Sequence, residues 1–363
     1  MLYDIEKVLK EMNLLYQNFY KWLFDMYDSD TGGFYYSKSA KDSIEFSTDI
    51  ESTGQGLNIL WRSSLITNMP ISIKNGFINF FQSRQSTKTG YFYDHQNNMK
   101  NFDRMVARAF SYSIHSLDMF GAVPLHPLPG SYGTNNLPNY FQNTDKLLNW
   151  MEDRDWNNSW MACDNISAAS FYINELTKEV KDKYVSTILS FLSSKQDSEG
   201  MWGKGTPYIK ISGAFKLCIL YSRLNVPMPN VDKIYKYILY TIANDKTSHM
   251  CFTRNTVDLL NVIKSYLPNL DENDLYLIIN TTYSNLKKFL KTDGGFSRFI
   301  KNSPKMPNNV LLGKGLSEGD MNSATQALKI RSLCNSILNK QDKPLKNFSN
   351  DFIMLLNDKK NYQ

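Results

Sequence analysis

The chain has 363 residues, of which 42% are hydrophobic and 21% charged, and its formal net charge at pH 7 is +6. This composition suits one large globular domain or two, with enough apolar residues for a sizeable core. The basic residues never form a block of about five or six, so nucleic-acid binding is not expected. No apolar run approaches the roughly 18 residues of a membrane-spanning helix.

The cysteines and the N-terminus both bear on location. The four cysteines lie far apart and form no CxxC pair, which favours buried free thiols in a reducing compartment. The chain starts with a charged amphipathic pattern and not with a signal peptide, so we expect a cytoplasmic protein. Peripheral contact with a membrane is left open. No histidine pair has metal-ligand spacing and no cofactor motif appears, so neither metal nor cofactor is expected.

Glycine–aromatic turns recur along the chain. Four are plain: Gly32-Gly33-Phe34, Gly90-Tyr91-Phe92, Gly200-Met201-Trp202 and Gly294-Gly295-Phe296. The second, third and fourth turns are separated by about two repeat lengths each. We therefore expect two degenerate turns between them, one from Trp156 to Trp160 and one from His249 to Phe252. This spacing predicts a chain of six repeats.

Each turn is preceded by a segment with the apolar spacing of an amphipathic helix. In chain order these segments are residues 2–27, 71–84, 140–152, 175–195, 231–243 and 272–291. Each turn is followed by a second helix that is more uniformly apolar. In chain order these are residues 52–64, 105–120, 166–176, 212–224, 257–267 and 323–338.

Alternation of amphipathic and apolar helices indicates two layers, with the apolar helices inside. Six such hairpins predict an all-α fold, an (α/α)6 toroid with inner and outer helix layers. An open solenoid of hairpins is the alternative. We expect residues 1–340 to form a single domain and residues 341–363 to be a C-terminal surface appendage. Two long loops, 124–138 and 301–319, are candidates for a lid.

One turn carries a motif seen in a known superfamily. Gln196 to Trp202 reads QxxxGxW, which resembles the QW motif of squalene and oxidosqualene cyclases. The two GGF turns resemble the repeats of protein prenyltransferase β-subunits, and as a repeat pattern the resemblance spans roughly residues 1–340. It implies a terpenoid-cyclase-like toroid and an isoprenoid or prenyl diphosphate substrate. The DxDD proton donor and the zinc-binding pattern of these families are absent. The Gln196 amide is expected to bond the end of a neighbouring helix.

Polar residues near the inner-helix starts are the candidate site, because in a toroid these helices all begin at one end. The predicted catalytic acids are Asp49, Glu51, Glu318 and Asp320. The predicted substrate-binding residues are Arg104, Arg108, Asp164, Lys210, Arg254, Asn322 and Trp160. Clustered carboxylates repel, so one of them could hold a proton near neutral pH and act as an acid. Asp49, Asp164 and Asp320 are equally well placed to be helix N-caps.

Three functions remain open from the sequence: two enzymes with a small-molecule substrate, an isoprenoid or a sugar, and a scaffold that uses the end of the ring as a docking surface. The first is a terpenoid-cyclase-like enzyme, in which a carboxylic acid protonates the isoprenoid and the arginines and Lys210 hold a diphosphate. The second is a carbohydrate-active enzyme, a glycosidase, lyase or epimerase, because paired carboxylates suit acid–base cleavage of a glycosidic bond. The third is a binding scaffold without catalysis.

Overall fold

The computed structural model describes residues 2–94, 97–129, 138–173, 178–267 and 270–360. Within these ranges the regular structure is helical, apart from a two-residue hairpin of β1 (Tyr27–Asp28) with β2 (Gly33–Phe34). The predicted fold class is confirmed: the chain is all-α and its helices follow one another as hairpins. No helix of the described residues is both long and apolar enough to cross a membrane.

The chain divides into two compact units, each assembled from segments that are distant in the sequence. Unit 1 comprises residues 1–8, 135–285 and 332–341, and unit 2 comprises residues 9–134, 286–331 and 342–363. The description of residues 1–340 as one domain with an appendage at 341–363 stays a prediction.

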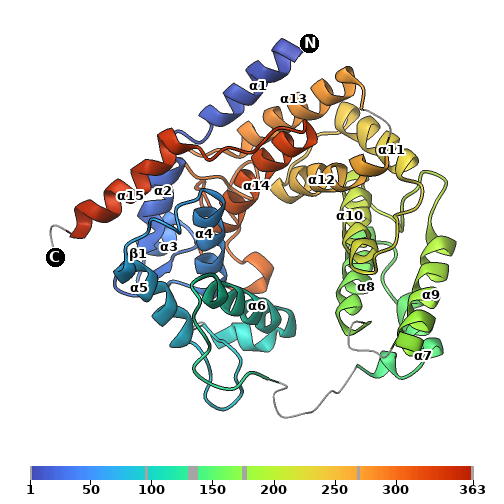
Figure 1. Cartoon of the computed structure of the whole chain (residues 1–363), viewed down its shortest axis with the longest axis horizontal. Helices are drawn as coiled ribbons and strands as arrows, with labels where there is room; N and C mark the ends of the chain where they lie inside the picture. The colour runs from blue at the N-terminus through green and yellow to red at the C-terminus, as the bar shows by residue number, and fades with distance from the viewer. Residues whose placement is uncertain (1, 95–96, 130–137, 174–177, 268–269, 361–363) are drawn as a thin grey trace. The chain divides into compact units, whose positions relative to one another are not determined.

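Unit 1 is built of outer and inner helices in alternation. They are α7 (Thr144–Glu152), α8 (Ser159–Ile173), α9 (Lys178–Lys195), α10 (Pro207–Arg223), α11 (Val231–Asn244), α12 (Met250–Ile263) and most of α13 (Glu272–Phe289), with short 3-10 turns at Asn139–Phe141 and Lys264–Tyr266. The inner helix α10 packs between α8 and α12 (Figure 1). The α8–α10 contact requires Gly213, because a Cβ there would lie 2.0 Å from the Ser159 hydroxyl oxygen.

Unit 2 contains the first two hairpins and the start of the last inner helix. Its helices are α2 (Phe19–Met26), α3 (Lys38–Lys41), α4 (Ile50–Arg62), α5 (Ile71–Gln82), α6 (Asp103–Met119), the start of α14 (Met321–Ile337), and α15 (Lys346–Lys360), with 3-10 turns at Asn97–Asn101 and Pro307–Asn309. The inner helix α4 packs on α6, and α15 packs on α2 (Figure 1). Phe34 and Phe77 stack with their centroids 5.7 Å apart in the core of this unit.

All four plain turns share one geometry, in which the turn aromatic forms a β-bridge with a residue one to three positions after the end of the outer helix. The pairs are Tyr27–Phe34, Gln85–Phe92, Gln196–Trp202 and Leu290–Phe296. Glycine is required at these turns because their backbone enters the left-handed region, with φ of +80° at Gly200 and +93° at Gly294. The Gln196 side-chain oxygen accepts a hydrogen bond from Asn230 at the start of α11, at 2.7 Å, as expected.

The structure corrects the two degenerate turns. Ser159 and Trp160 open α8, and Met250 to Phe252 open α12, so both stretches contain helix starts. Each of these helices is preceded by a capping residue: Asn158 Oδ1 accepts the Met161 N–H at 3.1 Å, and His249 Nδ1 accepts the Cys251 N–H at 3.0 Å. Both helices therefore begin earlier than the predicted residues 166 and 257. The first predicted helix is also broken, because α1 (Leu2–Leu14) ends before α2 begins at Phe19.

Candidate functional site

Asp49 is the N-cap of α4, and half of its carboxyl group is left unpaired. Its Oδ1 accepts the backbone N–H of Ser52 at 2.8 Å, and its own N–H donates to the Phe34 carbonyl at 3.3 Å. The residue is 1% exposed, and Oδ2 is buried with no hydrogen-bond partner among the described residues. Burying an unpaired carboxylate oxygen is costly, so this oxygen favours a proton or a bound ligand.

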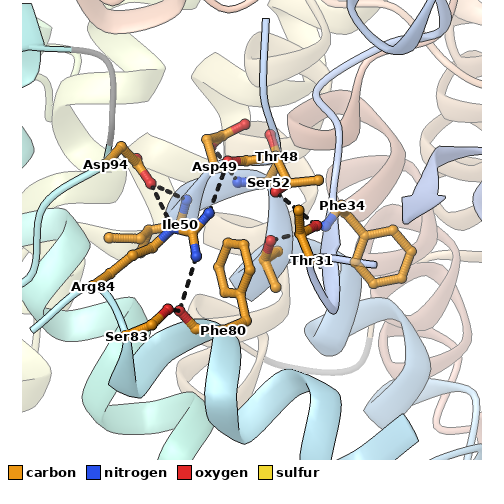
Figure 2. A network of polar contacts seen from close by, with 11 residues as sticks. Thr31, Phe34, Thr48, Asp49, Ile50, Ser52, Phe80, Ser83, Arg84 and Asp94 are labelled. Atoms are coloured by element: carbon orange, nitrogen blue, oxygen red, sulfur yellow. Dashed lines mark hydrogen bonds and ion pairs between the residues drawn. The ribbon is translucent and has the colours of Figure 1, made fainter. Parts of the chain in front are cut away.

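Asp94 meets the same helix start from the second hairpin. Its Oδ1 accepts the N–H of Ile50, the first residue of α4, at 2.9 Å (Figure 2). The N-terminus of α4 therefore receives two carboxyl groups, one from each of two consecutive repeats. The partial positive charge of a helix N-terminus stabilises negative charge there, but among the described residues only Asp94, of the two, lies within ion-pair distance of a cation.

That cation is Arg84, which lies two residues after the end of α5, the outer helix of the second hairpin. Its Nε lies 3.5 Å from Asp94 Oδ1, and its terminal nitrogens donate to the carbonyls of Phe80 and Thr48 at 3.0 and 3.3 Å (Figure 2). The guanidinium also lies over the Phe80 ring, 3.5 Å from its centroid. These contacts fix the guanidinium against Asp94.

Burial and mutual repulsion change the proton affinity of the pair. Burial, followed by the negative charge of Asp94, raises the pKa of Asp49 well above its ordinary value. Burial raises the pKa of Asp94 to about 6, while the Arg84 charge opposes that rise. Since Arg84 forms its ion pair with Asp94 and acts on Asp49 only at longer range, Asp49 is the group of the two that holds a proton more tightly.

The position of Asp94 follows a rule of the repeat. It lies two residues after the turn aromatic, where other repeats use a backbone carbonyl to accept the first N–H of an inner helix. The examples are Tyr36 with Met321 at 2.9 Å and Lys204 with Ser159 at 2.8 Å. Asp94 makes the equivalent bond with its side chain, and this brings a carboxylate to the helix start.

Glu51 is the third acid at the start of α4. It forms a two-pronged ion pair with Arg108 of α6, with Oε2 3.1 Å from Nε, and it accepts a further hydrogen bond from Gln55 at 3.2 Å. Asn322, the predicted binding residue on α14, lines a small pocket with Glu51 and Gln55. Glu51 therefore faces the pocket region with its charge compensated.

The three acids line one small pocket, which the loop 301–319 covers. Its walls are Asp49, Glu51 and Asp94, with Met99, Met105, Ala109, Val310 and Leu312. Val310 and Leu312 come from the loop and are 3% and 5% exposed. The space that remains is about that of one water molecule. The other lid candidate, 124–138, includes residues 130–137, which lie outside the described residues.

Asp320 caps α14 as Asp49 caps α4, but both of its oxygens are satisfied. Oδ1 accepts the Ser323 N–H at 2.9 Å and Oδ2 accepts the Arg298 N–H at 2.8 Å. The residue is fully buried, and burial raises its pKa to about 6. It is absent from the walls of the two pockets described for unit 2.

Glu318 fastens the loop 301–319 to the first hairpin. Its carboxylate accepts hydrogen bonds from the Ser37 hydroxyl at 3.0 Å, the Ser39 hydroxyl at 2.5 Å and the Ser39 N–H at 2.8 Å. Because the buried Glu318 carboxylate accepts three hydrogen bonds from the first hairpin, it holds the loop in place.

The charged predicted residues of unit 1 each form an ion pair with a residue outside the predicted set. Lys210 contacts Asp197 at 2.8 Å and Glu199 at 3.2 Å. The remaining ion pairs are Asp164 with Lys216 at 2.7 Å and Arg254 with Asp258 at 2.5 Å. Trp160 is half-buried in α8. The side chain of Arg104, in unit 2, lies outside the described residues.

Arg84 and Asp94 were not among the sequence-derived candidates. The search concentrated on inner-helix starts, whereas both residues flank the second glycine–aromatic turn. A usable signal was present, because Asp94 is the acidic residue two positions after a turn aromatic. Among the described residues, no group of three or more His, Cys, Asp or Glu is arranged to hold a metal ion.

Comparison with known proteins gives limited likeness. No family model and no curated protein matches the chain. Among solved structures, unsaturated glucuronyl hydrolase from Streptococcus agalactiae matches with a TM-score of 0.41 and 13% identity, over 91% of each chain. A mutant of that enzyme complexed with dGlcA-GalNAc6S matches with a TM-score of 0.40 and 15% identity, again over 91% of each chain. These hydrolases have the (α/α)6 toroid fold predicted for this chain.

The terpenoid-cyclase interpretation is wrong. The solved structures named above are glucuronyl hydrolases. The contacts agree, because three of the four cations expected to hold a diphosphate are instead paired with carboxylates: Arg108, Lys210 and Arg254. A pocket walled by three acids also does not suit an anionic substrate.

Proposed function

We propose that the protein is a carbohydrate-active enzyme that cleaves a glycosidic bond with Asp49 and Asp94 as its acid–base pair. The observation that carries this proposal is the unpaired, buried Oδ2 of Asp49 in a pocket lined by Asp94 and Glu51. Two carboxyl groups whose surroundings separate their proton affinities are the arrangement that general acid–base chemistry requires.

The two carboxyls would take opposite roles. Asp49 keeps the proton and donates it from Oδ2 to the glycosidic oxygen as the bond to the anomeric carbon breaks. Asp94, kept ionised by Arg84, accepts a proton from the water that attacks that carbon. Exchange of protons with solvent then restores both groups. Glu51, whose charge Arg108 compensates, would accept hydrogen bonds from sugar hydroxyls.

The covering loop limits what can enter. Ligand pockets for small molecules usually enclose about 300–1,000 Å³, whereas this one accommodates about one water molecule. A sugar ring therefore needs Val310 and Leu312 to withdraw, and the Glu318 contacts with Ser37 and Ser39 would set how readily they do. We place the protein in the cytoplasm as part of the same proposal, supported by its four free cysteines.

A panel of 4-nitrophenyl glycosides, neutral and acidic, tests the proposal through release of nitrophenol. We expect turnover of at least one member by the wild type and loss of that turnover in Asp49→Asn. Asp164→Asn is the matched control, because it removes a carboxylate that is paired with Lys216 in unit 1. Turnover that survives in Asp49→Asn contradicts the assignment. Absence of turnover across the panel by folded protein favours the non-catalytic scaffold.

A further inference from the structure

The outer surface of the covering loop has an unusual composition. Residues 299–316, called here the docking loop, expose five large apolar side chains: Phe299, Ile300, Met306, Leu311 and Leu316, each 38–52% exposed. Single exposed apolar residues are ordinary, but several on one loop indicate an interaction surface.

Backbone hydrogen bonds bring these side chains together in two groups. At the base of the loop, Ser303 N–H donates to the Leu316 carbonyl at 2.9 Å and Phe299 N–H donates to the Asn302 carbonyl at 3.2 Å. At the tip, Leu312 N–H donates to the Lys305 carbonyl at 3.2 Å. The apolar residues at 299, 300 and 316 thus share the base, and those at 306 and 311 share the tip.

The charge of the docking loop has one sign. It carries Lys301, Lys305 and Lys314, all exposed, and the sequence has no Asp or Glu from 298 to 317. The next acid, Glu318, is buried in hydrogen bonds to Ser37 and Ser39. Exposed apolar side chains interleaved with lysines match the two layers of an anionic membrane surface, the acyl boundary and the charged headgroups.

We propose that the docking loop binds the protein peripherally to an anionic lipid surface. The lysines contact the headgroups, and the apolar side chains at its base and tip enter the boundary below them. The inward side of the same loop supplies Val310 and Leu312 to the acidic pocket. The lipid-facing surface is therefore continuous with the pocket cover. This proposal stands independently of the reaction at Asp49 and Asp94.

Co-sedimentation with vesicles tests it, using phosphatidylcholine alone and phosphatidylcholine mixed with phosphatidylserine. The wild type should partition at least about tenfold more strongly onto the anionic vesicles. Both a Phe299→Ser/Leu316→Ser variant and a Lys301→Glu/Lys305→Glu variant should lower that partition by about tenfold or more. The controls Ile44→Ser/Met354→Ser and Lys88→Glu alter exposed apolar and basic residues outside the docking loop, and they should leave the partition unchanged.

Each alternative result overturns the proposal. Equal binding to both vesicle types would show that anionic lipid is not required. If the lysine variant weakens binding and the apolar variant does not, the protein is adsorbed by charge alone. Binding to an acidic polysaccharide without vesicle partition identifies a different partner. Circular dichroism checks that each variant is folded. As a second readout, Leu316→Trp should gain fluorescence that brominated lipid quenches, whereas Ile44→Trp should not.

Discussion

The first and sixth repeats begin their inner helices with the same local sequence and use it differently. Asp49, Ser52 and Gln55 correspond to Asp320, Ser323 and Gln326, and both aspartates are N-caps. Both also donate their N–H to the carbonyl of the aromatic in a GGF turn. The scaffold of the two helix starts is therefore equivalent.

The difference lies in the second carboxyl oxygen. In the sixth repeat it accepts the Arg298 N–H, whereas in the first repeat it is left facing a pocket and a second aspartate, Asp94. Asp320 uses both carboxyl oxygens to accept backbone hydrogen bonds, whereas Asp49 keeps Oδ2 available for a reaction. An N-cap residue is thus not excluded from chemistry, because capping occupies only one of its two oxygens.

Replacing Asp49 should give the largest effect on activity. Asp49→Asn keeps the capping oxygen for Ser52 but removes the acidic proton, so kcat should fall roughly 10²- to 10⁴-fold. The melting temperature should change little, since asparagine caps helices as well as aspartate does. Kinetics and thermal denaturation of one preparation check both parts. A large loss of stability with normal activity would make the first repeat equivalent to the sixth.

The corresponding change in the sixth repeat should act on stability instead. Asp320→Asn replaces one of two accepting oxygens by an NH₂ group, which cannot accept from Ser323 or Arg298. Leaving one buried N–H unsatisfied should cost about 1–3 kcal/mol of unfolding free energy. Urea denaturation measures it, and kcat should stay near the wild-type value. An Asp320→Asn protein that is stable but inactive would contradict the comparison.

The same variant should change the pH dependence of stability. The pKa of Asp320 is raised to about 6 in the folded protein, above its value in the unfolded chain. The folded state therefore binds the proton more tightly, and this contribution is present at low pH and is lost as pH rises through about 6. Between roughly pH 4 and 6 the wild type should lose stability relative to Asp320→Asn. Parallel curves for both proteins would contradict the assignment.

Arg84 should control where activity appears on the pH axis. Removing its charge in Arg84→Gln raises the pKa of Asp94 above about 6, because burial then acts without the opposing cation. The ascending limb of the kcat profile should move upward by about one pH unit, whereas Arg84→Lys should keep it near the wild-type position. If the ascending limb lies at the same pH in Arg84→Gln and Arg84→Lys, Asp94 is not the base.

The smallest expected effect is on stability and concerns the first turn of the inner helix, where the first and sixth repeats differ in one residue. Thr53 Oγ1 accepts the Phe34 N–H at 2.9 Å, and the corresponding residue in the sixth repeat is Ala324. Thr53→Val keeps the shape and removes the acceptor, at a cost of about 1 kcal/mol by thermal denaturation. An unchanged melting temperature would mean that the two turns are equally supported without this bond.

Helix class and order were predictable because apolar periodicity and the glycine turns are local signals. The positions of α4, α5, α11 and α14 agree with the expected segments to within about two residues at each end. The starts of α8, α10 and α12 were placed five to seven residues late, and in α8 and α12 the residues of the first turn had been interpreted as degenerate turns before the helix.

The candidate site was harder to predict because it depends on pairing between repeats. Asp49 and Glu51 were selected from their place before an inner helix, but nothing local distinguishes Asp49 from Asp320. The distinction comes from Asp94, which is 45 residues away from Asp49 in sequence and belongs to another hairpin. A single sequence does not state which turn lies against which helix start, so Arg84 and Asp94 could not be ranked.

The bond from one hairpin to the start of a neighbouring inner helix has an evolutionary consequence. Where the main chain makes it, as at Tyr36 and Lys204, the bond itself does not depend on which side chain occupies that position. A shift of the bond from carbonyl to side chain, as at Asp94, places a reactive group beside a helix terminus without altering the repeat around it. At each such position, one substitution can place a reactive side chain at the start of an inner helix while the backbone of the repeat stays the same.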